Sequence, residues 1–472
     1  MALWTERPVR ENPSDEGPRL NAVLKDEGDA SARAELDRLA TLAEQVLAGC
    51  KRAGASSAEV GLSVDRGIDV TVRLGEVETL VHTRDRGVSV TVYFGQRKGA
   101  ANTADLAPAS IEATIAHACA IARHTEADPC AGLADPARLA REFPELDLWH
   151  PWDLSAERAI ELGRACEGAG RASEPRITNS DGAQVSSSAS LSVYANSHGF
   201  VGRERGTRHM ISCSLVGEDE QGMQRDYWYS SVRAPADLED SEAIGRRAAA
   251  RTAARLGARS LSTRECPVLF IPEVARGLIG HFVSAVSGGS IYRRASFLLD
   301  QIDQPVFPDW MSIVERPHLA RGQGSSAFDA EGVATRDSDL VRDGRLTRYV
   351  LGSYSARKLG LQSTANAGGV HNLVAATGPL DFAGMLREMG SGFVVSEVLG
   401  QGVNIVSGDY SRGAAGFWVE NGEIAFPVEE VTIASNLKTM LRNLRAVGSD
   451  VDLRSHILTG SILVDRMTVA GG

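Results

Sequence analysis

Residues 267–300 read PVLFIPEVARGLIGHFVSAVSGGSIYRRASFLLD, and this stretch marks where the character of the chain changes. The apolar run before Pro272 predicts a buried strand, and Pro272 itself suits the first turn of a helix. Apolar residues at helical spacing continue from 273 to 287, and the pair Gly288-Gly289 ends the pattern. The stretch therefore predicts a strand followed directly by a buried helix.

The chain after this helix is rich in glycine and in alternating apolar positions. Asp343-Gly344 and Asn421-Gly422 are dipeptides typical of two-residue β-hairpin turns. Around the second dipeptide, the sequence GFWVENGEIAFPV alternates apolar and polar residues on both sides of the turn. We therefore predict a β-rich C-terminal domain.

The chain before residue 260 shows one order of elements twice. A helix from about 34 to 53 precedes alternating strands, which include 77–83 and 88–94, and a helix that starts at Pro108. A helix over about 155–171 then precedes further strands and a closing helix from Asp237 to Arg255. This repetition predicts a two-layer domain of antiparallel strands and helices with an internal duplication.

The predicted fold class is α+β. The predicted parts are a disordered polar arm over 1–30, an α+β N-terminal domain over 31–258 with halves at about 31–125 and 153–258, and the β-rich C-terminal domain over 259–472.

Composition limits the cellular compartments and the classes of partner that this protein can have. The 472-residue chain has a net charge of −11, which argues against nucleic acid as a partner. The N-terminus lacks the apolar core of a signal peptide, and no apolar run is long enough to span a membrane. The six cysteines are scattered without C-x-x-C pairs, as in a reduced compartment. We predict a cytoplasmic protein without a membrane or nucleic-acid partner.

Glu273 and His281 lie on the helix after Pro272 and are weak candidates for a degenerate zinc site. A zinc helix of the HExxH kind places two histidines one turn apart, with a glutamate beside them to activate water. Here the two residues are more than two turns apart, and no cysteine follows Cys266. We predict no metal and no catalytic residue in this chain.

Two further patterns remain open. Ser355 and Lys358 match the S-x-x-K spacing of some serine hydrolases, although the partner motifs of those enzymes are missing. A second group combines glycines with polar side chains that suit an extended peptide or another subunit. Its members are Asn366, Gly368, Gly369, Asp409 and Arg412.

Four long segments carry a resemblance to a known family. They are GGSIYRRASFLLDQIDQPVFPD, FDAEGVATRD, SYSARKLGLQSTANAGG and VNIVSGDYSRGAAGFWVENGEIAFPVEEVTIASNL. They resemble the TldD/PmbA family of bacterial metalloproteases, in its TldE (PmbA) branch. The resemblance extends over nearly the whole chain from about residue 34.

The resemblance implies a function that the residues alone do not give. In the TldD branch, a His-Glu-x-x-x-His helix and a downstream cysteine hold zinc, and this sequence has EVARGLIGHF at the matching place. The family implies that a TldE-type chain, itself without the zinc, pairs with a TldD-like subunit that carries it. The pair would degrade or trim small unfolded or extended peptides, including peptide precursors. Because homologous folds can pair through one shared patch, the surface that faces the TldD-like subunit could also hold a homodimer when that subunit is absent. Two alternatives remain: a free-standing hydrolase using Ser355 and Lys358 or another metal site, and a peptide-binding protein without a catalytic partner.

Overall fold

The computed structural model describes residues 18–471, with side chains from residue 29 onward. Its N-terminal part is built on one antiparallel six-stranded sheet with strand order β3-β2-β1-β4-β5-β6. The elements of this part are α1 (Pro18–Arg52), β1 (Ser57–Arg73), β2 (Glu76–Phe94), β3 (Arg97–Thr103), α2 (Pro108–His124), the 3₁₀ turn Pro136–Arg138, α3 (Ala156–Ser173), β4 (Ile177–Asn196), β5 (Val201–Asp219), β6 (Gly222–Val232), the 3₁₀ turn Pro235–Asp237 and α4 (Ser241–Ala254).

The sheet and its helices are formed by two copies of one structural unit. Each unit runs helix, three strands, helix: α1-β1-β2-β3-α2 and then α3-β4-β5-β6-α4. β1 and β4 pair antiparallel at the centre, and each unit adds its other two strands outward in chain order. The predicted α+β fold class is thus confirmed, and the two halves have the same strand order, as the duplication requires.

Three predicted boundaries differ from the structure. The first helix begins at Pro18, so residues 18–30 of the predicted disordered arm are helical, while residues 1–17 lie outside the described part. β2 runs unbroken through the gap predicted between its two strands, because Arg84 and its neighbours keep pairing with β1. The closing helix α4 begins only at Ser241, where Asp240 caps it by accepting a hydrogen bond from Ala243 N. The predicted domain limits stay predictions.

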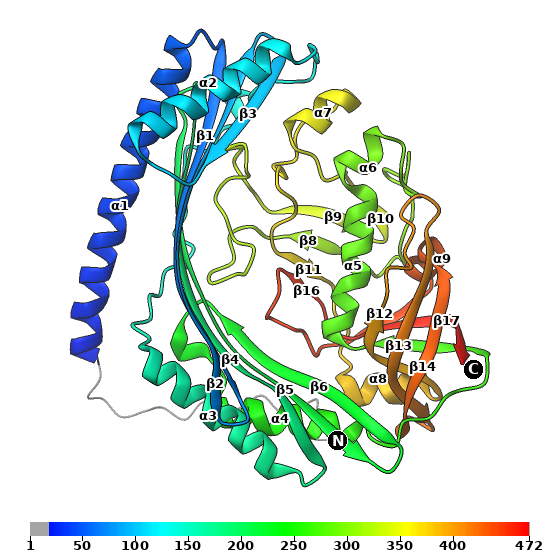
Figure 1. Cartoon of the computed structure of the whole chain (residues 1–472). Coiled ribbons are helices and arrows are strands. Elements are labelled where there is room, and N and C mark those ends of the chain that lie inside the picture. The colour runs from blue at the N-terminus through cyan, green and yellow to red at the C-terminus, as the bar shows by residue number, and fades with distance from the viewer. Residues whose placement is uncertain (1–17, 472) are drawn as a thin grey trace.

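The two faces of this sheet differ in character. Alternate residues of β1, such as Val60, Leu62 and Val64, are buried in one core with apolar residues of α1 and α2. The helices lie along the outer, convex side of the curved sheet, and the C-terminal part lies on its concave side (Figure 1). Polar residues such as Ser63 and Ser192 line a groove on the sheet. The sheet therefore separates an apolar helical layer from a more polar face.

The C-terminal part contains two further sheets. One has strand order β14-β13-β12-β7-β17-β15, with an additional pairing between β14 and β17, and the other has order β10-β9-β8-β11-β16. The elements are β7 (Arg264–Phe270), α5 (Pro272–Val286), α6 (Gly288–Tyr292), β8 (Ile313–Glu315), β9 (Ser338–Arg342), β10 (Arg345–Leu346), α7 (Ser353–Leu359), β11 (Leu373–Ala375), α8 (Phe382–Met389), β12 (Gly392–Leu399), β13 (Asp409–Glu420), β14 (Glu423–Asn436), α9 (Leu437–Arg442), β15 (Leu444–Val447), β16 (Ile457–Leu458) and β17 (Ile462–Gly471).

Both predicted hairpin turns are present. Asp343-Gly344 joins β9 to β10 and Asn421-Gly422 joins β13 to β14, with positive φ at all four residues. The sheets are mixed, since β7 pairs parallel with β12, and β11 pairs parallel with β16. The described helices include none that is long and apolar enough to cross a membrane.

Candidate functional site

The helix α5 follows β7 as predicted and packs within the C-terminal core. Pro272 occupies its first turn, and the buried face is apolar. The buried residues are Pro272, Ala275, Leu278, Ile279, Phe282, Ala285 and Val286. They pack in the largest core cluster with residues of β7 and β12, such as Val268 and Phe393. Helix α5 is therefore fixed in place, and so are its candidate residues Glu273 and His281.

Glu273, on the first turn of α5, is held by arginines from two other elements. Its Oε1 accepts a hydrogen bond from Arg454 Nη2 at 3.0 Å and lies 3.6 Å from Arg251 Nη1 of α4. Arg454 in turn donates to Asp452 at 2.8 Å. The side chains of Glu273 and Arg251 are only 12% and 5% exposed, so this ion cluster joins the N-terminal and C-terminal parts in a poorly hydrated place.

His281 lies about 12 Å further along the helix axis, since each residue adds about 1.5 Å. Its ring packs edge-on to Tyr410, with 6.1 Å between ring centroids. Burial, together with the positive charge of Arg412, lowers the pKa of His281. The structure does not bring Glu273 and His281 together.

Ser355 and Lys358 also point to different partners. Ser355 Oγ donates to Gly352 O at 3.1 Å, whereas Lys358 Nζ contacts Asp128 Oδ1 at 3.1 Å. Hydrogen bonding to Asp128 raises the pKa of Lys358, which keeps the amine protonated and unfit to accept a proton from serine. The geometry disfavours the serine-hydrolase alternative.

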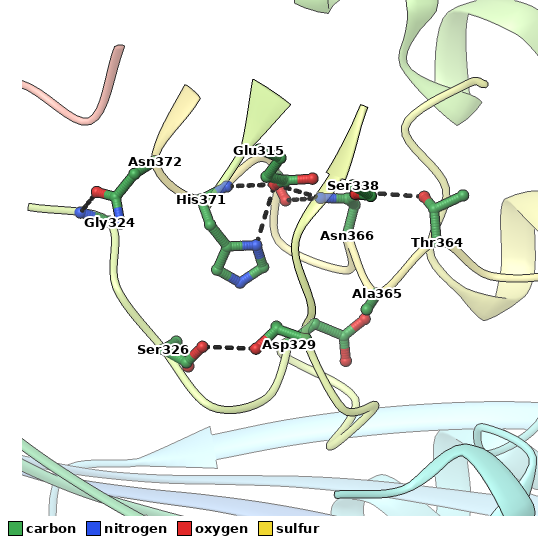
Figure 2. A network of polar contacts seen from close by, with 12 residues as sticks. Glu315, Gly324, Ser326, Asp329, Ser338, Thr364, Ala365, Asn366, His371 and Asn372 are labelled. Carbon is green, nitrogen blue, oxygen red and sulfur yellow. Dashed lines mark hydrogen bonds and ion pairs between the residues drawn. The ribbon is translucent and has the colours of Figure 1, made fainter. Parts of the chain in front are cut away.

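A buried polar network lies between β8 and the segments that follow α7 (Figure 2). Glu315 on β8 accepts hydrogen bonds from Arg348 Nη2 at 2.5 Å, from Asn366 Nδ2 at 2.9 Å and from the His371 backbone at 2.6 Å. His371 Nδ1 lies 3.1 Å from the same carboxylate. Burial alone would raise the pKa of Glu315, but His371 and Arg348 outweigh it, and the pKa is lowered.

This arrangement fixes the ring of His371. An ionised carboxylate only accepts hydrogen bonds, so Nδ1 of His371 is protonated and donates a hydrogen bond to Glu315. The ring points toward the N-terminal sheet (Figure 2). On that sheet Glu204 of β5 is buried, which raises its pKa, while Ser326 and the charge of His371 act in the opposite direction. The hydrogen bond that Ser326 donates to Glu204 is thus a further polar contact between the two parts of the molecule.

Asp329 extends the network toward the loop after α7. Its carboxylate accepts hydrogen bonds from the backbone of Glu331, Val333 and Ala367 at 2.9–3.0 Å. These three donors lower the pKa of Asp329, but burial has the larger effect and raises the pKa to about 6. This carboxylate can change its charge near neutral pH, which few side chains of this type do.

A cavity of about 720 Å³ opens beside Glu273, between strands β4–β6 and α5. Its wall combines aromatic and charged side chains, which include Tyr227, Tyr229, Arg255, Arg276 and Glu397. Aromatic faces and guanidinium groups suit a peptide that presents both apolar and acidic side chains.

Three family models match most of the chain. They describe domain 1, the central domain and the C-terminal domain of the PmbA/TldA metallopeptidases, and they match residues 58–122, 149–256 and 263–471. The chain is also 49% identical to Metalloprotease PmbA of Escherichia coli O157:H7, over 88% of this chain and 92% of that protein. The chain belongs to the PmbA/TldD family.

Other members agree with this assignment. A Metalloprotease PmbA homolog of Haemophilus influenzae is 46% identical over 89% of this chain and 93% of its own length. A crystal structure from Bacteroides thetaiotaomicron VPI-5482, described as a candidate modulator of DNA gyrase, superposes with a TM-score of 0.87 at 26% identity, covering 92% of this chain and 98% of that one. TldE from Thermococcus kodakarensis shares the fold, with a TM-score of 0.80 at 19% identity over 91% of this chain and 100% of its own.

Zinc, which the PmbA/TldD resemblance implies for one branch, does not fit the donors of α5. Glu273 is occupied by two guanidinium groups, whose positive charge opposes a divalent cation, and His281 is two turns away. Cys266 on β7 is buried, which raises its pKa to about 11 and keeps it a thiol rather than a thiolate ligand. Over the described residues, no three His, Cys, Asp or Glu side chains gather in a way that could hold a metal.

The residues predicted for peptide binding or an interface fall into two groups. Asn366, Gly368 and Gly369 lie near the Glu315 network, and Asn366 is buried with its amide bonded to Glu315. Asp409 and Arg412 lie on β13 in the other sheet. Asp409 is exposed and bonds to Ser407, whereas Arg412 is half-buried and donates to the Leu399 carbonyl. Asn366 thus has a structural role, and the binding role of the set stays a prediction.

Sequence reasoning missed the pairing of Glu315 with His371 and the burial of the carboxylates Asp329 and Glu204. The histidines are scattered along the chain, so no local pattern marks His371. One signal could have pointed to Glu315, namely that this carboxylate directly follows the apolar pair Ile313-Val314, as a buried charge that needs a partner would.

Proposed function

We propose that this chain is the TldE-type, non-catalytic subunit of a two-chain zinc metalloprotease. Its partner is a TldD-like chain that carries the zinc, and the pair degrades or trims small unfolded or extended peptides, including peptide precursors. The observation that carries the proposal is the state of α5: the helix and its surrounding core are intact, while Glu273 is used in an ion cluster with Arg251 and Arg454.

The rest of the molecule supports a role in holding peptides. The cavity beside Glu273 and the groove on the N-terminal sheet are both lined by polar and aromatic side chains. An extended peptide has unpaired backbone groups along its whole length, so such surfaces can receive it by hydrogen bonds and side-chain contacts. The cytoplasm is the compartment we propose, since all six cysteines are free.

The test is reconstitution with a TldD-like relative and an unfolded peptide. We expect this chain alone to cleave no peptide, the TldD-like chain alone to be slow, and the mixture to cleave rapidly and to elute as one mixed species. The matched control is a mixture in which the TldD-like chain has lost its zinc-binding histidines, which should be inactive. Full activity of the TldD-like chain alone, with no mixed species in size-exclusion chromatography, would contradict the proposal.

The same assay separates the two alternatives. A free-standing hydrolase would cleave without a partner and lose that activity in Ser355→Ala, although Ser355 Oγ is engaged with Gly352 O. A peptide-binding protein without a catalytic partner would bind the unfolded peptide and never co-elute with the TldD-like chain.

A further inference from the structure

Two hollows lie between the N-terminal sheet and the C-terminal part. One is the cavity of about 720 Å³, to which Ser212 of β5 and Arg276 of α5 contribute. The other is the groove of about 690 Å³, to which Glu204 of β5 and Phe328 contribute. Because each hollow combines residues of both parts, the two hollows lie at the same interface. An extended peptide bound between the two parts can therefore contact both.

Arg208 lies midway between the two hollows. Side chains that are two or four residues apart on a strand lie on one face, so Glu204, Arg208 and Ser212 follow each other along β5. A rise of about 3.3 Å per residue places Arg208 about 13 Å from each of the other two. Arg208 is exposed, and its Nη2 donates to the neutral amide oxygen of Gln323 at 2.7 Å. Over the residues that the structure describes, Arg208 has no ion pair with a carboxylate.

His456 approaches Arg208 from the loop before β16. Gly324, which follows the bonded glutamine, packs so closely on His456 that a Cβ added to the glycine would lie 2.8 Å from His456 Cβ. His456 is exposed, and its ring makes no hydrogen bond with any residue that the structure describes. Partial burial lowers the pKa of His456, and the positive charges of Arg208, Arg276 and His371 lower it further. The charged groups that act on this ring are thus all positive.

The carboxylates nearby are engaged with other groups. Arg276 lies 3.5 Å from Asp452, but Asp452 also accepts a hydrogen bond from Arg454 at 2.8 Å. Glu204 accepts a hydrogen bond from Ser326 of the C-terminal part. The arginine between the two hollows therefore keeps a charge that no carboxylate of the described chain neutralises.

We propose that Arg208, Arg276 and His456 bind a carboxylate of the peptide that this chain holds, so that the chain prefers acidic peptides. A carboxylate offers only acceptor oxygens, and it matches guanidinium and imidazole donors that lie together. An aspartate or glutamate side chain supplies this group, and so does a free C-terminus. The inference rests on the proposed role in holding peptides, and it names the class of peptide.

The test is direct binding of labelled, unstructured peptides to the isolated chain, measured by fluorescence anisotropy. Three peptides share one sequence of glycine, serine and tyrosine. The first is blocked at both ends and has a central glutamate, the second has glutamine in its place, and the third is the glutamine peptide with a free C-terminus. We expect the first to bind at least about tenfold more tightly than the second.

The third peptide identifies the source of the carboxylate. If it binds as tightly as the glutamate peptide, the site accepts the end of a peptide as well as an acidic side chain. If it binds as weakly as the second peptide, the site takes side chains. Equal affinity for all three peptides, or no binding of any of them at about 1 mM, would overturn the inference.

Substitutions place the carboxylate on this chain. Arg208→Gln should reduce the preference for the glutamate peptide to within about threefold, and Arg208→Gln/His456→Ala should remove it. Arg208→Lys, which keeps the charge, should retain most of the preference. The matched control is Arg203→Gln on the opposite face of β5, where Arg203 lies 3.0 Å from Asp37 of α1. The control should bind as the wild type does, and an unchanged preference in the double variant would contradict the site.

A proton titration tests the site in the unaltered chain. The basic neighbours of His456 lower its pKa, and a bound carboxylate opposes their effect. The pKa of His456 measured by NMR should therefore rise when the glutamate peptide binds and stay constant with the blocked glutamine peptide. The signal is assigned by its loss in His456→Ala. A constant pKa with the saturating glutamate peptide would overturn the inference.

Peptide cleavage by the reconstituted pair remains a separate result. A chain that supports cleavage by a TldD-like partner, yet binds all three peptides equally, keeps the proposed function and loses this inference. A chain that prefers the glutamate peptide, yet never joins the partner, keeps the carboxylate site and loses the role of subunit.

Discussion

Two carboxylates of the C-terminal part, Glu315 and Glu273, are each neutralised by arginine, yet their clusters have different structural roles. Glu315 is held by Arg348, Asn366 and His371, all from the same part of the chain. Glu273 is held by Arg454 and by Arg251, which belongs to α4 of the N-terminal part. The first cluster stabilises one part internally, and the second joins two parts. The comparison teaches that the start of α5 serves as a joint between the N-terminal and C-terminal parts.

The largest effect should come from breaking the internal cluster. Glu315→Gln removes the charge that Arg348 needs and leaves a buried guanidinium without its carboxylate. We expect a loss of about 3–5 kcal/mol in the free energy of unfolding. Calorimetry should show a lower unfolding temperature. The control is Glu423→Gln, an exposed position on β14, which should change stability by less than about 0.5 kcal/mol. Equal unfolding temperatures for the two variants would contradict the assignment.

The second effect is a pH dependence from the same region. The pKa of Asp329 is raised from 3.8 to about 6 in the folded chain. The folded state therefore binds more protons than the unfolded state between these values, and stability falls as pH rises from about 4 to 6. The change is worth up to about 3 kcal/mol, from the size of the shift. Asp329→Asn should remove this slope in urea unfolding measured across that range. An unchanged slope in the variant would contradict the raised pKa.

The joint at Glu273 should be the weaker of the two clusters. Glu273→Gln leaves Arg454 with its bond to Asp452, so the expected loss is about 1–2 kcal/mol. The exposed pair Glu265–Arg466 provides the control, since Glu265→Gln should have no measurable effect. Peptide cleavage by the reconstituted pair should stay within about two-fold of the wild type, because Glu273 acts on no reacting atom. A loss of cleavage without a loss of stability would make Glu273 a catalytic residue.

The sequence predicted elements whose signals are local. The strand before Pro272, the helix α5 and the hairpins at Asp343-Gly344 and Asn421-Gly422 depend on apolar period and turn chemistry, which a short window contains. The repeated order of helices and strands was also visible, because each repeat has its own pattern. The family resemblance was confirmed by the comparisons for the same reason: its motifs are long and continuous.

The sequence could not predict contacts between distant segments. Glu315 and His371 are 56 residues apart, and Glu273 and Arg454 are 181 residues apart. No local sequence pattern encodes contacts over such separations. The unbroken β2 was missed because Arg84, Asp85 and Arg86 look like a turn, whereas pairing with β1 keeps them extended. The early start of α1 was missed because its first residues have low apolar content, which a disordered arm also has.

The most direct test of the central claim is the zinc content of the isolated chain. The protein should be purified without chelators, exposed to zinc, dialysed and measured by elemental analysis beside its His281→Ala variant. We expect far less than one zinc per chain and no difference between the two proteins, because Glu273 is paired with arginines and His281 lies two turns away. Close to one zinc per wild-type chain, lost in His281→Ala, would contradict it.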